Sequence, residues 1–98
     1  IIYLSAGTEI DISYHINKDE SLTVLKGKGK YVFYNNDLSI AKEHTLSSFE
    51  QMTDETRCFE RINRFIPHKI QVIEDMLIYE TTSGPFSPGD TAYKIDQV

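Results

Sequence analysis

Residues 7–27, GTEIDISYHINKDESLTVLKG, hold two strand-like runs on either side of a short polar segment. Alternate residues of the first run are predicted to face opposite sides, Ile10, Ile12 and Tyr14 on one and Asp11, Ser13 and His15 on the other. A turn is predicted at 17–19 and a second strand at 21–26. Because residues beside a hairpin turn lie about 4.5–5.5 Å apart, His15 and Glu20 are expected side by side. An imidazole and a carboxylate placed in this way can share one divalent cation.

Short strand-like runs separated by turn residues continue along the chain. Further strands are predicted at 1–4, 30–34, 38–40, 58–66, 68–73 and 76–82, with a tight reversal at Gly27 and Gly29 and a turn at Glu74–Asp75. Residues 41–57 lack regular alternation and are predicted to form a long connection with a short strand at 46–49, leaving His44 exposed. Residues 83–90, with two prolines and two glycines, are predicted to be a loop. No strand–helix–strand rhythm appears, so an antiparallel barrel or double-sheet jelly roll is expected.

Length and composition limit the classes of protein that the chain can represent. Its 98 residues predict one domain spanning 1–98. The net charge of −5 argues against a nucleic-acid partner. The sequence contains no run of about 18 apolar residues, so no membrane span is predicted. Cys58 is the single cysteine, which excludes an internal disulfide and is compatible with a cytoplasmic location. The first residues do not resemble a signal peptide, and the start at Ile1 rather than at Met indicates a segment upstream.

The spacing within residues 7–27 resembles the first motif of the cupin family, which is Gly, five residues, His-x-His, three or four residues, Glu, six residues, Gly. Here Gly7 is followed by five residues, then Ser13-Tyr14-His15, four residues, Glu20, six residues and Gly27. Every spacing agrees, and Ser13 replaces the first histidine. The resemblance implies a single-domain, all-β cupin jelly-roll barrel, also described as a double-stranded β-helix. It is similar to small cupins of the mannose-6-phosphate isomerase-like and polysaccharide-biosynthesis kinds.

The second cupin motif, Pro-x-Gly, two residues, His and then Asn, is matched only by the adjacent Pro67 and His68. Either the loop is shortened and His68 is the ligand, or Pro67 aligns and Val72 takes the ligand position. The first alignment is adopted because the residues after His68 resemble the strand that follows this histidine in cupins. The resemblance then implies a metal site of His15, Glu20 and His68 for Zn, Mn, Ni or Fe, with no organic cofactor. The alternative is a polar pocket that binds an organic ligand directly.

Four further residues are predicted to form a substrate pocket. Ser13 occupies the position of the missing ligand, Tyr31 and Phe33 can stack on a sugar, and Arg64 can bind a phosphate or carboxylate. The alternatives are core packing for the two aromatic residues and a solvated surface charge for the arginine.

Three functions follow from the resemblance, each with a small-molecule ligand. The first is an isomerase or epimerase-like protein acting on a phosphorylated or nucleotide-linked sugar. The second is a non-catalytic binding module that has lost its metal, and the third is a dioxygenase. Whether the chain is an enzyme is left open. The apolar row of Ile10, Ile12 and Tyr14 needs cover, so a homodimer is expected.

Overall fold

The computed structural model of the chain describes residues 1–16, 18–83 and 91–93. The strands are β1 (Ile2–Leu4), β2 (Glu9–His15), β3 (Glu20–Tyr34), β4 (Ile40–Ser47), β5 (Thr56–Arg57), β6 (Phe59–Ile62), β7 (His68–Thr82) and β8 (Thr91–Tyr93), with a short 3-10 helix, η1, at Phe49–Gln51. The all-β class predicted from the sequence is therefore confirmed. The described part of the chain has no helix with the length and apolarity needed to cross a membrane.

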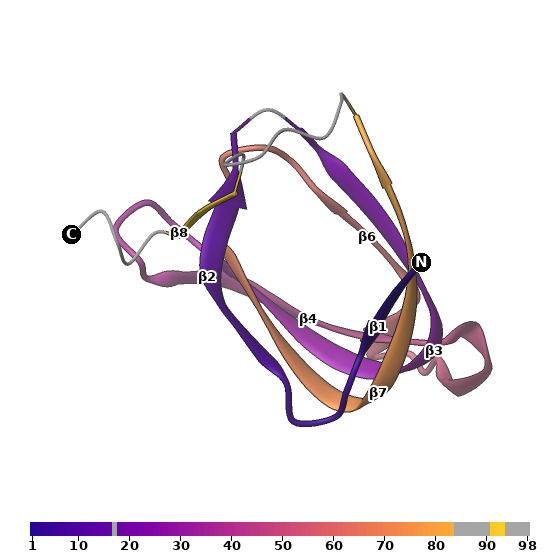
Figure 1. Cartoon of the computed structure of the whole chain (residues 1–98). Coiled ribbons are helices and arrows are strands. Elements are labelled where there is room, and N and C mark those ends of the chain that lie inside the picture. The colour runs from indigo at the N-terminus through magenta and orange to yellow at the C-terminus, as the bar shows by residue number, and fades with distance from the viewer. Residues whose placement is uncertain (17, 84–90, 94–98) are drawn as a thin grey trace.

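Two long strands, β3 and β7, pair antiparallel along most of their length and bend together. The first half of β3 and the second half of β7 form one wall of the barrel with β6 and β1. The other halves form the second wall with β4 on one side and β2 on the other. Figure 1 shows how the two walls curve around a common interior. Strands β5 and β8 extend the second wall at its edges.

The bend shared by β3 and β7 corrects two predictions. The reversal predicted at Gly27 and Gly29 is wrong because β3 runs through both glycines, and the turn predicted at Glu74–Asp75 is wrong because both residues lie inside β7. The register between the strands shifts repeatedly between Val24 and Gly29. Gly27 has a φ of +90°, and a Cβ there would lie 1.9 Å from the Asp75 carbonyl oxygen. The glycine thus permits a bulged bend in which two backbones touch.

Residues 41–57 differ most from the prediction. Instead of a long connection, β4 covers most of the first half of this segment and pairs with β3 from Lys28 to Tyr34. His44, predicted to be exposed, is half-buried within this strand. The backbone of β3 supplies the hydrogen bonds that make 40–47 a strand, so tertiary pairing overrides a weak local pattern. Apart from Ser83, the loop predicted at 83–90 lies outside the described residues.

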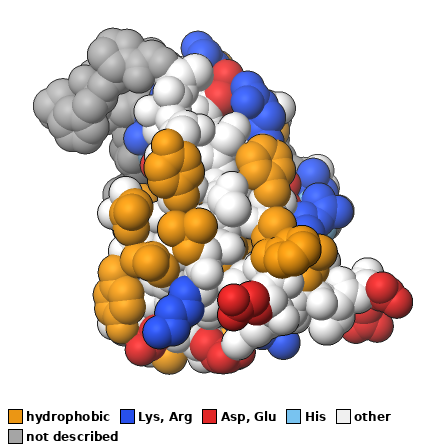
Figure 2. Space-filling view, turned by 90° about the vertical axis from the view of Figure 1, so that its right-hand side faces the viewer, with side chains coloured by type: hydrophobic (Ala, Val, Ile, Leu, Met, Phe, Trp, Pro, Cys, Tyr) orange, Lys and Arg blue, Asp and Glu red, His pale blue; other side chains and the backbone are white. Residues whose placement is uncertain are grey.

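The interior of the barrel is filled by buried apolar side chains from both walls. They are Leu22, Val24, Tyr31, Phe33, Leu46, Ile62, Val72, Met76 and Ile78. The outer surface of the wall that contains β1 and β6 also carries large apolar side chains. Tyr3, Leu25, Phe59 and Tyr79 are each between 48% and 62% exposed there. Figure 2 shows apolar side chains gathered over this side of the molecule.

Candidate functional site

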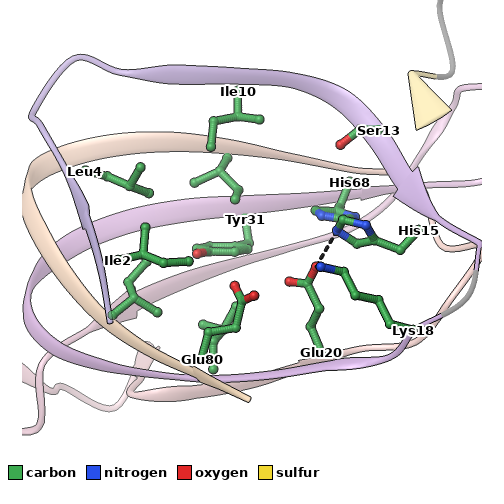
Figure 3. Close-up of a pocket in the computed structure, with 13 residues that line it drawn as sticks. Ile2, Leu4, Ile10, Ser13, His15, Lys18, Glu20, Tyr31, His68 and Glu80 are labelled. Atoms are coloured by element: carbon green, nitrogen blue, oxygen red, sulfur yellow. Dashed lines mark ion pairs between the residues drawn. The ribbon is translucent and has the colours of Figure 1, made fainter. Parts of the chain in front are cut away.

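A cavity of about 280 Å³ opens between the walls near β1, β2, β3 and β7. Its lining has an aliphatic end and a polar end, as Figure 3 shows. The aliphatic side chains are those of Ile2, Leu4, Ile10, Leu22, Ile70 and Ile78, and the polar ones are those of Ser13, His15, Lys18, Glu20, His68, Tyr31 and Glu80. This composition, mostly apolar with a few convergent polar groups, is typical of small-molecule sites.

Strand β2 brings Ile10, Ser13 and His15 to the same cavity. Strict alternation would place Ile10 on the opposite face from the other two, and that prediction is wrong. The register of β2 against β7 shifts between Ile10 and Ser13, so the alternation is interrupted by one residue. Ile10 therefore cannot belong to an outward apolar row with Ile12 and Tyr14. The homodimer stays a prediction, but Ile10 no longer supports it. Ser13 is only 4% exposed.

His15 and Glu20 meet as predicted, but not across a hairpin. Strand β2 pairs with β7 and β8, whereas β3 pairs with β4, β6 and β7. Because β2 ends in one wall and β3 begins in the other, the two side chains approach each other across the mouth of the barrel. His15 Nε2 contacts Glu20 Oε1 directly, and Lys18 Nζ lies 4.0 Å from the same oxygen.

The connection that precedes Glu20 is held by residues of the segment after β6. The backbone N–H of Arg64 donates to Asp19 Oδ1 at 2.7 Å, and its guanidinium lies 3.3–3.4 Å from both carboxylate oxygens. These bonds hold the pKa of Asp19 below its usual value, with the backbone N–H as the largest cause. The N–H of Phe65 donates to the His15 carbonyl oxygen at 2.7 Å. Arg64 is thus placed beside the site and outside the cavity lining, where it holds Asp19, the residue before Glu20 at the start of β3.

His68, at the start of β7, is 5% exposed and faces the cavity. Its Nδ1 lies 2.9 Å from the Ile66 carbonyl oxygen. A carbonyl only accepts hydrogen bonds, so Nδ1 carries the proton and Nε2 is left as the acceptor. Burial lowers the pKa of His68, which favours this neutral form. The His15 and His68 ring centroids are 6.0 Å apart.

The three predicted metal ligands line one cavity, and their donor types suit Zn, Mn, Ni or Fe. Among the residues that the structure describes, no group of three His, Cys, Asp or Glu side chains is arranged to hold a metal ion. His15 and Glu20 contact each other directly, and the His68 ring stands apart from them. Metal binding at His15, Glu20 and His68 therefore stays a prediction.

Of the four predicted pocket residues, the structure brings Ser13 and Tyr31 to the cavity. Phe33 is buried behind it, with its ring 6.4 Å from His68 and 5.7 Å from His44 between centroids. The predicted role of Phe33 in stacking on a ligand therefore gives way to packing against the two histidine rings.

Two polar residues of the interior, Glu60 and Glu80, were missed in the sequence. Along β7, Glu80 continues the two-residue spacing of Met76 and Ile78, and in β6 Glu60 lies two residues before Ile62. Side chains two residues apart in a strand share a face, so this alternation could have placed both glutamates on the inward face. Glu60 Oε2 accepts a hydrogen bond of 2.5 Å from His44 Nδ1, and the guanidinium of Arg57 lies 3.8 Å from the same oxygen. This pair ties β4 to β6.

No family model matches the chain, and a comparison with curated proteins finds no match. Solved structures do resemble it. Capsular polysaccharide assembling protein CapF from Staphylococcus aureus superposes with a TM-score of 0.72 and 24% identity, over 93% of this chain and 24% of that one. A dTDP sugar isomerase from Desulfovibrio desulfuricans G20 gives a TM-score of 0.72 and 15% identity, over 94% of this chain and 60% of that one. A conserved protein of unknown function from Streptococcus pyogenes gives 0.62 and 15%, over 87% and 61%.

These likenesses, together with the two-walled barrel, show that the chain has the cupin jelly-roll fold. The fold predicted from residues 7–27 is thus confirmed. The chain spans about a quarter of the CapF chain and about three fifths of the other two.

Proposed function

We propose that this cupin domain binds the sugar part of a phosphorylated or nucleotide-linked sugar in its cavity and acts there as an isomerase or epimerase. One observation carries the proposal: three strands direct His15, Glu20 and His68 into a single cavity. The cavity lies just below the range of about 300–1,000 Å³ that drug-sized ligands occupy, which suits one sugar ring. Two structural neighbours, a dTDP sugar isomerase and a capsular polysaccharide assembling protein, support this ligand class.

Isomerisation or epimerisation beside a carbonyl requires a base that removes a proton from carbon and a group that stabilises charge on oxygen. His68 suits the first role, since its Nδ1–H is held by the Ile66 carbonyl and its Nε2 is an acceptor. Among the described residues none bonds to this Nε2. The His15–Glu20 pair suits the second role because it presents an imidazole oriented by a carboxylate across the mouth of the barrel.

Proton exchange tests this proposal. The purified protein is incubated in deuterated water with a dTDP-linked keto sugar, and loss of the proton next to the carbonyl is followed by NMR. The His68→Gln variant is expected to exchange at least about 100-fold more slowly, the usual minimum for loss of a general base. Glu74→Gln, which changes an exposed residue of the same strand, should match the wild type. Exchange at the wild-type rate in His68→Gln, or no binding of the sugar to the wild type, contradicts the proposal.

A divalent metal at His15, Glu20 and His68 is a second proposal for the same cavity, supported by the donor types. Elemental analysis of protein purified without chelator tests it. Metal that is bound by the wild type and lost in His15→Ala supports it, and iron with oxygen consumption would favour a dioxygenase. Protein that carries no metal and binds sugar without exchange would instead support a non-catalytic binding module, which Ser13 at the first ligand position favours.

A further inference from the structure

Tyr31 and Glu80 both line the middle of the cavity, between its aliphatic end and its polar end. Tyr31 lies in the middle of β3 and is 1% exposed, and Glu80 comes from β7 and is half-buried. Figure 3 shows the Glu80 carboxylate directed towards the Tyr31 ring from the opposite wall. The three-residue group of His15, Glu20 and His68 lies at the other end of the same cavity.

Within the described residues, neither the Tyr31 hydroxyl nor the Glu80 carboxylate has a hydrogen-bond partner. The other carboxylates of the interior differ, since Glu20 contacts His15 and Glu60 contacts His44. A buried tyrosine hydroxyl normally finds a partner, because leaving it unbonded costs free energy. The two groups are therefore available to a ligand.

Their chemistry defines what that ligand must offer. Burial and, next, the charge of Glu80 raise the pKa of Tyr31, so its hydroxyl stays protonated and can donate. A carboxylate only accepts. A ligand hydroxyl, which can accept one hydrogen bond and donate another, satisfies both groups at once. A ligand carboxylate or phosphate would face the charge of Glu80, and a hydrocarbon would leave both groups unsatisfied.

We propose that Tyr31 and Glu80 form a donor–acceptor pair that binds a hydroxyl group on a neutral ring and excludes anionic groups from this part of the cavity. The ring's C–H faces would lie against Ile2 and Leu4, which line the same end. An anionic substituent such as a phosphate would be directed towards Lys18 or out of the mouth. The inference rests on the proposed function only in assigning the ligand to the same cavity, and it names hydroxylated rings as the class that binds there.

Two small probes that do not depend on sugar recognition test the pair. The probes are trans-1,2-cyclohexanediol and cyclohexanecarboxylate, which share an apolar ring and differ in the group presented. Binding is measured by NMR on tyrosine-labelled protein, in which the Tyr31 signal is identified by its loss in Tyr31→Phe. The diol is expected to shift the Tyr31 signal, and the carboxylate is expected to bind at least about tenfold more weakly.

The variants have matched controls on the same barrel. Tyr31→Phe and Glu80→Gln are each expected to weaken diol binding by about tenfold, and Glu80→Gln should also admit the carboxylate. Tyr79→Phe and Glu74→Gln change an exposed tyrosine and an exposed glutamate, so both should bind the diol as the wild type does. For the Tyr31→Phe protein, binding is read from the probe's own signals.

The outcomes separate this inference from the proposed function. Failure of the diol to bind, equal binding of diol and carboxylate, or unchanged diol binding in Tyr31→Phe and Glu80→Gln overturns the donor–acceptor pair. Diol binding that depends on both residues, in a protein that binds no phosphorylated or nucleotide-linked sugar, upholds the pair and overturns the proposed function.

Discussion

Replacing Gly27 by alanine is expected to destabilise the barrel far more than the same change at Gly7. Both glycines have a positive φ, +90° and +84°, and an alanine in the left-handed region costs about 1–2 kcal/mol. At Gly7 nothing lies within 4 Å of the new Cβ, whereas at Gly27 it would lie 1.9 Å from the carbonyl oxygen of Asp75. That neighbour is backbone, so no side-chain rotation relieves the clash and β3 must move away from β7. Such overpacking adds about 1–3 kcal/mol, which gives about 2–5 kcal/mol in total.

Urea unfolding followed by circular dichroism measures the difference, since the chain has no tryptophan to report by fluorescence. Gly7→Ala is expected to lose about 1–2 kcal/mol of unfolding free energy and to remain folded. Gly27→Ala is expected to lose clearly more, or to be unfolded before urea is added. Equal losses for the two variants would refute the reasoning, because they would mean that β3 and β7 do not touch at this bend.

Three further predictions concern the interior and the outer surface. Burial lowers the folded-state pKa of His68, so the unfolded state binds its proton more readily, and stability should fall as the pH drops below 6.5, with a shallower fall in His68→Gln. Glu60→Ala leaves the half-buried His44 without its carboxylate and should lower the unfolding free energy by about 1–3 kcal/mol. Analytical ultracentrifugation is expected to show a homodimer that Phe59→Glu or Tyr79→Glu converts to a monomer, since both residues are about half exposed on one apolar face.

Each of these has its own control and contrary result. Ile73→Gln, at an exposed position of the same strand, should keep the wild-type fall in stability with pH, and an equally steep fall in His68→Gln would remove His68 as its cause. Glu43→Ala removes an exposed partner of Lys30 and should cost little, so equal costs for Glu43→Ala and Glu60→Ala would contradict the account of the interior pair. A wild-type monomer would end the homodimer prediction.

The spacing in residues 7–27 predicted that His15 and Glu20 would meet, and they do, but the geometry behind the prediction was wrong. When only the neighbouring sequence is considered, a hairpin is the one local structure that brings the two residues together. In the structure β2 ends in one wall and β3 begins in the other, and bonds from Arg64 and Phe65 hold Asp19 and His15 at these two ends. Those two residues lie more than forty positions away in the sequence, so no local pattern contains their effect.

Strand periodicity succeeded where one wall of the barrel repeats without interruption. It would have found Glu80 from its spacing after Ile78. It failed at Ile10, where a register shift against β7 breaks the alternation. A bulge is set by the pairing of two strands, so one strand's sequence does not reveal it.

What the amino-acid sequence determined by itself was the class of fold and the identity of the polar groups at the mouth, because period-two patterning and glycine spacing are local properties of the chain. The tertiary structure alone decided which strands pair, how β3 and β7 bend through Gly27, and which side chains share the cavity. The physical reason is that strand hydrogen bonds and side-chain contacts across a barrel join residues far apart in sequence. Their register is chosen by packing of the whole interior. Tyr31 and Glu80 illustrate this, since β3 and β7 bring them to one cavity although 48 residues lie between them.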